Sequence, residues 1–243
     1  MKNRIMLLIV MLLAAWQGAS AQDKDTVWTR DLWQLGSTIR EVQFTPDGQN
    51  VAVAIENGVY IFDITSGNLV KDFSKYMYGC RYFTFSDDGK KLITASDNDK
   101  IIIWDYEKGD TIRVFNEIAI QEIKLINDNI IIGIWNLPTW QLDSSKVCLF
   151  DINTGQVVRK ESLASQNSFI EASVLPVSKE NNLIAVVIGN KYDSNFNIEL
   201  CDLTTLKKIA TLGSHASNVT DLAFSSDGKY LASASRDGII KIS

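Results

Sequence analysis

Cysteine and histidine are scarce in this sequence of 243 residues, which has three cysteines and one histidine. The cysteines, Cys80, Cys148 and Cys201, are odd in number and far apart, so they form neither a disulfide framework nor a zinc-binding pattern. We expect three small, buried, apolar side chains, although an oxidising compartment would allow one disulfide. A lone histidine, His215, also leaves few options for a Ser-His-Asp triad or for catalytic zinc. We therefore expect no catalytic residue, no metal and no cofactor.

An excess of basic charge is also missing. Lys and Arg number 24 against 29 Asp and Glu, and the net charge is −5. No basic stripe offsets this balance, so a phosphate backbone would be repelled and nucleic acid is not expected as a partner. Beyond the N-terminus there is no apolar run long enough for a transmembrane helix.

The N-terminus has the pattern of a signal peptide over residues 1–21. Lys2 and Arg4 precede a short apolar run, and small residues up to Ala21 suit a signal peptidase. The run is about eleven residues long, shorter than the roughly twenty that span a bilayer, although an uncleaved anchor is the alternative. We expect export to the periplasm or the extracellular space, with no stable membrane span after cleavage.

The rest of the chain, residues 22–243, consists of repeats. One turn occurs three times, at Phe44–Gly48, Phe85–Gly89 and Phe224–Gly228. Each copy is followed by an apolar strand, a polar turn and another strand. The third strands of the first four repeats end in an aspartate, which we interpret as a turn residue: Asp63, Asp105, Asp151 and Asp202. The intervals between them equal or exceed the roughly 40–45 residues of a four-stranded propeller blade.

Several strands are apolar at successive positions, as in 101–103, 130–132 and 183–188. Such strands must be covered on both faces. Blades packed face to face around an axis provide that cover, whereas an isolated sheet does not. The pattern predicts an all-β fold, a β-propeller of four-stranded antiparallel blades.

These residues resemble the tryptophan–aspartate (WD40) repeat family of β-propellers. The stretch from His215 to Ile242 is similar to a near-consensus repeat, and the repeat through Trp104-Asp105 is the next best match. We identify the chain as a secreted, bacterial-type member. Phe62, Phe150 and Cys201 stand where the family prefers Trp. About five blades are present, with the boundaries 39–73, 80–115, 120–161, 169–212 and 218–243.

The resemblance implies that an N-terminal strand closes the ring, and 27–32 is the candidate. Ser243 falls where Trp104 lies in the second repeat, so the fifth repeat ends early. Two interpretations follow: a small five-bladed ring, or a fragment of a larger ring with seven blades. The end within a strand favours truncation.

The resemblance also implies a buried structural network rather than a catalytic site. In the family, a histidine at the position of His215 bonds an aspartate in a turn, a strand serine and the Trp. Carried over, the partners are Asp237 and either Ser233 or Ser235, with Ser243 leaving the network incomplete. Trp104 and Asp105 are the corresponding residues of the second repeat.

Two inserted loops hold the candidate binding residues. They occupy 136–145 and 189–196 in adjacent blades, and they carry Trp140, Leu142, Tyr192 and Phe196. Large aromatic residues on loops of a rigid scaffold are typical of binding sites, but they can also cap their own blades. Capping is the favoured interpretation for Phe196. We expect a monomeric, exported, non-enzymatic scaffold that binds a protein or peptide. The alternatives are a propeller that binds a small ligand or carbohydrate, and the non-catalytic part of a larger secreted enzyme.

Overall fold

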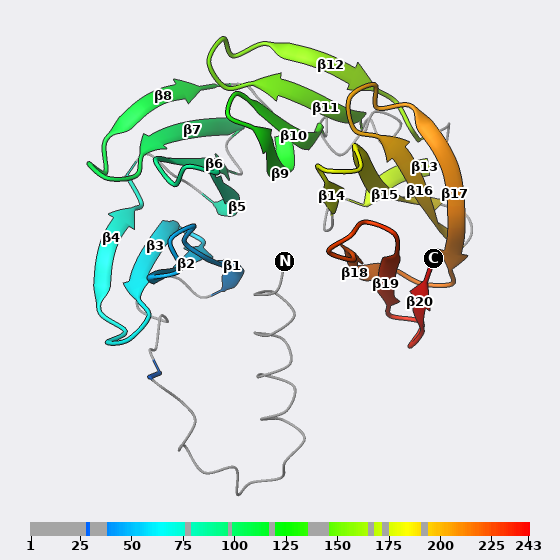
Figure 1. Ribbon diagram of the computed structural model, residues 1–243, viewed down its shortest axis with the longest axis horizontal. Coiled ribbons are helices and arrows are strands. Elements are labelled where there is room, and N and C mark those ends of the chain that lie inside the picture. Colours follow the sequence, from blue (N-terminus) through cyan, green and yellow to red (C-terminus); the bar gives the residue numbers. More distant parts are fainter. Residues whose placement is uncertain are drawn as a thin grey trace, which may run out of the picture.

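The computed structural model is an arc of antiparallel β-blades (Figure 1). The part of the chain that the model describes contains strands and turns, without a helix long and apolar enough to cross a membrane. The described residues are 28–29, 38–75, 79–96, 99–116, 120–135, 146–164, 168–171, 175–190 and 194–243.

Each blade is a meander in which consecutive strands pair, so that the first strand lies nearest the axis (Figure 1). Blade 1 consists of β1 (Ile39–Phe44), β2 (Asn50–Ile55), β3 (Gly58–Asp63) and β4 (Leu69–Phe73). Blade 2 consists of β5 (Cys80–Phe85), β6 (Lys91–Ser96), β7 (Lys100–Asp105) and β8 (Thr111–Phe115). Blade 3 consists of β9 (Ile120–Asn127), β10 (Ile130–Trp135), β11 (Lys146–Asp151) and β12 (Val157–Glu161).

The last two blades depart from this plan. Blade 4 has an interrupted first strand and consists of β13 (Ser168–Glu171), β14 (Val177–Ser178), β15 (Leu183–Asn190), β16 (Phe196–Asp202) and β17 (Lys208–His215). Blade 5 has three strands among the described residues, β18 (Val219–Phe224), β19 (Leu231–Ser235) and β20 (Ile240–Ile242). The predicted all-β fold of five antiparallel blades is confirmed, and blade 4 extends slightly beyond the expected range 169–212 at both ends.

The expected closing strand, 27–32, lies mostly outside the described residues. Trp28 is described, and it packs on blade 1: its ring centroid lies 6.4 Å from that of Phe62. Its indole Nε1 donates a hydrogen bond of 2.8 Å to the carbonyl oxygen of Ile64. The pairing of the closing strand stays a prediction.

The turn between the first and second strands has the same hydrogen bonds in three blades. In blade 2, the Ser86 hydroxyl donates to the Asp88 carboxylate at 2.6 Å, and the same carboxylate accepts the Lys90 amide at 3.0 Å. Gly89 follows at φ 69°, a left-handed conformation that favours glycine. Blades 1 and 5 repeat this arrangement with Asp47 and Asp227.

The aspartates that end the third strands are turn residues, as predicted. Asp63 accepts the backbone amides of Thr65 and Ser66 at 3.1 and 2.7 Å. Hydrogen bonds from both of these residues lower the pKa of Asp63 from 3.8 to about 2. The corresponding turns begin at Asp105, Asp151 and Asp202.

The corresponding turn of blade 4 has no glycine at its left-handed position. Three of these turns place a glycine at positive φ, but in blade 4 Leu206 occupies that position at φ 57°. A left-handed conformation costs a non-glycine residue about 1–2 kcal/mol. The Leu206 side chain is fully buried, and burial of a leucine contributes about 1.5–3 kcal/mol, which offsets the strain.

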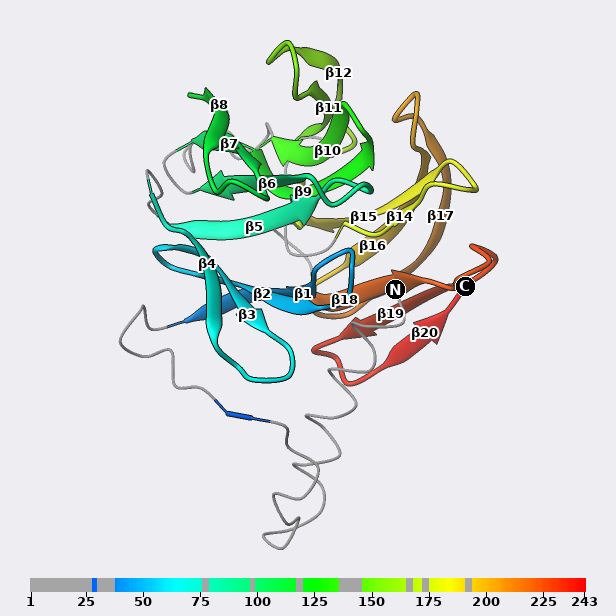
Figure 2. The same cartoon turned by 60° about the vertical axis from the view of Figure 1, so that its left-hand side comes forward.

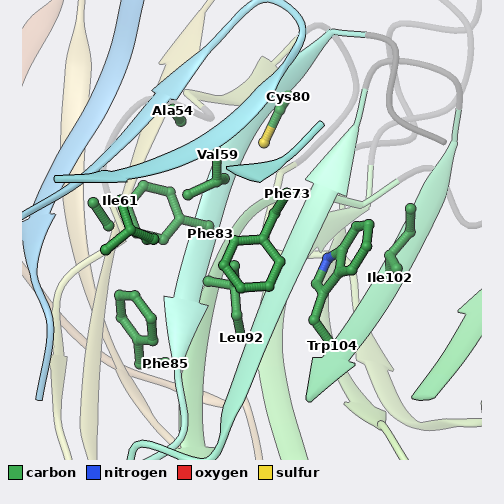
Figure 3. Packing of buried hydrophobic residues seen from close by; sticks show 11 residues of the cluster. Ala54, Val59, Ile61, Phe73, Cys80, Phe83, Phe85, Leu92, Ile102 and Trp104 are labelled. Carbon is green, nitrogen blue, oxygen red and sulfur yellow. The ribbon is translucent and has the colours of Figure 1, made fainter. Parts of the chain in front are cut away.

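The hydrophobic core consists of layers between successive blades. Between blades 1 and 2, small and β-branched residues of β2 and β3 face large residues of β5, β6 and β7 (Figure 3). Phe73, at the end of β4, packs edge-on against Trp104 with ring centroids 5.5 Å apart. Burial of this apolar surface is the main stabilising contribution, about 25 cal/mol for each Å² removed from water.

None of the three cysteines forms a disulfide, and all three are fully buried within these layers, as expected from the sequence. Burial raises the pKa of the Cys148 thiol to about 12 and that of Cys201 to about 11. These residues act as small apolar side chains rather than as reactive thiols.

The Asp63 turn gives a prediction for acid stability. Because the pKa of Asp63 is lowered on folding, its carboxylate stabilises the fold above pH 3.8, and this contribution is lost as the pH falls towards about 2. Asp63→Asn keeps an acceptor oxygen but removes the titration. The free energy of unfolding, measured with denaturant between pH 5 and pH 2, should converge for wild type and variant at the acid end. A difference that does not change with pH would contradict this assignment.

Candidate functional site

The histidine network forms as predicted. His215 ends β17 and is 1% exposed; its Nδ1 lies 2.9 Å from Asp237 Oδ2, and its Nε2 lies 2.9 Å from Ser233 Oγ. With the ring proton on Nδ1, His215 donates to the carboxylate and its Nε2 accepts from the hydroxyl of Ser233. The outer strand of blade 4 is thereby joined to the second strand of blade 5.

Of the two candidate serines, Ser233 is the histidine partner. Ser235 is the last residue of β19, and its hydroxyl donates to the Ser217 carbonyl at 2.9 Å and accepts the Asp237 amide at 3.1 Å. The turn that follows β19 places Asp237 so that its carboxylate also accepts the amides of Ala216 and Ile239, both at 3.0 Å. Burial opposes ionisation of Asp237, but the hydrogen bonds from His215, Ala216 and Ile239 prevail and lower its pKa to about 2.

The chain of Ser233, His215 and Asp237 has the hydrogen-bond order of a hydrolase triad, but it cannot act as one. Ser233 is 2% exposed and His215 is 1% exposed, so no substrate carbonyl can reach the hydroxyl. All polar atoms named above have partners within the fold, which is what buried polar groups require. The network is structural.

Blade 2 shows the tryptophan hydrogen bond of the WD40 network, which blade 5 lacks. The Trp104 indole donates to the Thr94 hydroxyl at 3.0 Å, and Thr94 occupies the position that Ser233 has in blade 5. In blade 5 the Trp position is held by Ser243, whose amide and carbonyl pair with Leu231 at 2.9 and 2.8 Å. Thr94 was not among the expected network residues, although an alignment of β6 with β19 places it opposite Ser233.

A second polar cluster lies on the innermost strands and was not anticipated. Glu41 of β1 is 8% exposed, and its carboxylate accepts the Phe83 amide of blade 2 at 3.0 Å. The ammonium group of Lys124, on β9, lies 3.4 Å from Glu41 and 3.4 Å from the buried Glu122. Glu41 thus links three successive blades near the axis. A charge pattern on three separate strands has no signature in sequence, because the strands meet only after folding.

Blades 4 and 5 are joined by a similar carboxylate. Glu171 of β13 accepts the Asn218 amide side chain at 3.0 Å and the Val219 backbone amide at 3.2 Å. These carboxylates satisfy backbone donors of the next blade, so their role is in assembly of the arc. Within the described residues there is no group of three or more His, Cys, Asp or Glu side chains that could hold a metal ion.

The predicted binding residues divide into two groups. Trp140, Leu142 and Tyr192 lie outside the described residues. The strands that flank their loops are well defined: Trp135 pairs with Lys146, and Gly189 pairs with Phe196. Both loops therefore connect the second and third strands of neighbouring blades 3 and 4.

Phe196 belongs to the core, which corrects its placement among the surface residues. It is 8% exposed and packs edge-on against Phe169, with ring centroids 6.4 Å apart. It is the first residue of β16 and lies in the apolar layer between blades 4 and 5, beside Ile198 and Val219. Phe196 therefore packs between two blades and is neither on the rim nor a cap over the end of its own blade.

Comparison with known proteins supports the repeat assignment. Residues 67–105 and 206–242 match the family profile described as WD domain, G-beta repeat. These two segments carry the WD40 repeat pattern. They include Trp104-Asp105 and the histidine network, which are the residues that suggested the WD40 family. The first segment runs from β4 of blade 1 through the third strand of blade 2, and the second runs from β17 of blade 4 through β20 of blade 5.

Longer similarities extend over most of the chain. It is 26% identical over 213 residues to apoptotic protease-activating factor 1 of Mus musculus, covering 85% of this chain and 15% of that protein. It is 22% identical over 200 residues to periodic tryptophan protein 2 of Arabidopsis thaliana, covering 82% and 21%. The chain thus spans only a small part of these relatives. Both come from eukaryotes, so they give no support to a bacterial-type origin.

The β-propeller domain of Cps50 (Swd1) from Myceliophthora thermophila has the same fold. The TM-score is 0.64 at 18% sequence identity, and the match covers 83% of this chain and 64% of that domain. At this identity the match concerns architecture alone. The WD40 propeller fold is therefore supported by sequence and by structure.

The network predicts a large effect of His215 on stability. His215→Ala would leave the Ser233 hydroxyl and the Asp237 carboxylate without their main partner and would open a cavity, at a cost of about 3 kcal/mol. Arg236→Ala, at an exposed position in the same turn, should change stability by less than about 0.5 kcal/mol. Both values can be measured by denaturant unfolding. A His215→Ala protein as stable as the Arg236→Ala control would contradict the assignment.

Proposed function

We propose that this chain is an exported WD40 scaffold that binds a protein or peptide through the rim formed by loops 136–145 and 189–196. The observation that carries the proposal is the position of the flanking strands. β10 ends and β11 begins at loop 136–145, and β15 ends and β16 begins at loop 189–196, so both loops connect the second and third strands of adjacent blades.

The proposed contact residues are Trp140, Leu142 and Tyr192. Phe196, at the C-terminal end of the second loop, is buried in the core and fixes the position of that end. Aromatic side chains presented by loops on a rigid scaffold bury a large area at low entropic cost and dominate many interfaces. The similarity to WD40 proteins agrees with a role in protein recognition.

A role without catalysis is supported by the burial and the hydrogen bonds of the histidine, the cysteines and the recurrent aspartates. The one histidine is used in the blade network, the three thiols are buried, and the recurrent aspartates bind their own turns. The histidine and these aspartates are thus engaged in hydrogen bonds within the fold, and the thiols are shielded from solvent.

Export is supported by the sequence of residues 1–21, which lie outside the described part of the structure. The positive start, short apolar run and small residues up to Ala21 match a secretory signal. Fully buried cysteines without a disulfide are compatible with an oxidising compartment, because buried thiols with raised pKa values, such as those of Cys148 and Cys201, react slowly.

The rim can be tested with peptides selected from a phage-displayed library on the wild-type protein. Trp140→Ala combined with Tyr192→Ala should weaken binding of the selected peptides by about tenfold or more, because aromatic anchors dominate interface energies. The temperature of unfolding should stay close to that of wild type.

The matched control replaces two exposed apolar residues of the outer strands, Val158→Ala with Ile209→Ala, and should leave peptide binding unchanged. If the rim variant unfolds at a much lower temperature, Trp140 and Tyr192 are core residues and the proposal fails. Saturable binding to a glycan array, with no peptide selected, would favour a carbohydrate-binding propeller instead.

A further inference from the structure

The inner turns, which join the first and second strands of each blade, are not alike. In Figure 2 the inner turns of blades 2 and 4 lie on the same side of the molecule. Blade 4 has residues 179–182 in place of the turn with a hydroxyl, an aspartate and a glycine that blades 1, 2 and 5 share. Asn182 adopts the left-handed conformation at φ 55°, and its side-chain amide donates to the Asp202 carboxylate of the same blade at 2.8 Å. The turn is thereby fixed to blade 4.

The ammonium group of Lys179 reaches past blade 3 to the inner turn of blade 2. Its Nζ lies 2.9 and 3.0 Å from the two carboxylate oxygens of Asp87. Asp88, the next residue, makes the hydrogen bonds of that turn, so the Asp87 carboxylate is not needed for them. Blades 2 and 4 are not neighbours in the arc, so this ion pair bridges the inside of the arc.

The inner turn of blade 3 is short and leaves room for this contact. Asn127 pairs with Ile130, so residues 128–129 alone connect β9 and β10. In blade 2 the pairing ends at Phe85 and Leu92, so the connection is longer. The backbone of blade 3 therefore stays out of the path between blades 2 and 4.

The same turn of blade 4 is also bonded to blade 5. The Asn181 side-chain amide donates to the Asp227 carbonyl oxygen at 3.2 Å and to the Ser178 hydroxyl of its own blade at 3.0 Å. A Cβ atom at Gly228 would lie 1.9 Å from Asn181 Nδ2, so the amide occupies space that a glycine leaves open. At the equivalent Gly48 of blade 1, no described residue beyond its chain neighbours comes within 4 Å of that position.

We propose that residues 179–182 form a strut that fixes the curvature of the arc by tying blade 4 to blades 2 and 5. Packing between neighbouring blades sets one angle at a time, whereas the bond between blades 2 and 4 restrains two successive angles together. The side chains of Lys179 and Asp87 are 41% and 65% exposed, so salt screens their attraction and the restraint weakens as the ionic strength rises. An ion pair this exposed contributes little to stability, so its loss changes the geometry of the arc more than its unfolding temperature.

The distance between spin labels on blades 2 and 4 tests the strut. Ile112→Cys with Ile209→Cys places labels on two exposed positions of the outer strands, while the native cysteines are buried and stay unlabelled. In double electron–electron resonance, Lys179→Ala should broaden the distance distribution and lengthen its mean. Exchange of the two charges, Lys179→Asp with Asp87→Lys, should restore the wild-type distribution.

The matched control is Glu180→Ala, at the next exposed position of the same turn, and it should keep the wild-type distribution. Salt at about 1 M should broaden the distribution of the wild-type arc and leave that of Lys179→Ala unchanged. Thermal unfolding shows that each variant is folded. A narrow distribution in Lys179→Ala, a charge-exchanged variant as broad as Lys179→Ala, or equal broadening in the control would each overturn the proposal.

Discussion

The structure depends on the burial of both faces of the middle strands of each blade by neighbouring blades. β2, β10 and β15 are almost entirely apolar, and most residues of β6 and of the third strands beside them are buried. A sheet of this composition would expose one apolar face to water if it stood alone. Between blades 1 and 2, small residues such as Ala52 and Ala54 face large aromatic residues of blade 2, which lets the two blades pack closely.

Polar interactions fix the order and spacing of the blades rather than supply most of the stability. Glu41 reaches from blade 1 to the backbone of blade 2, and Glu171 does the same from blade 4 to blade 5. The histidine network ties blade 4 to blade 5 further from the axis. Because each of these groups is satisfied only in the correct packing, they favour one arrangement of otherwise similar apolar layers.

Much of the fold could be predicted from sequence because the signals are local. The turn at Phe85–Gly89 needs a hydroxyl, a carboxylate and a glycine within five residues, and the structure shows all three in use. The resemblance to WD40 repeats narrowed the serine partner of His215 to Ser233 or Ser235, and the folded structure places Ser233 beside the ring. Leu206 at positive φ, by contrast, gave no signal, since its strain is offset by burial against distant residues. The placement of Phe196 depended on packing between blades 4 and 5, and the Glu41 cluster on three strands that meet only in the folded arc.

The central claim is that each blade shields the middle strands of its neighbour. Hydrogen–deuterium exchange of the backbone amides, resolved by strand, tests it most directly. The account predicts slow exchange in the second and third strands of blades 1 to 4 and faster exchange in the bulged outer strands β4, β8, β12 and β17. Equal exchange across all four strands of each blade, or rapid exchange in β6 and β7, would contradict it.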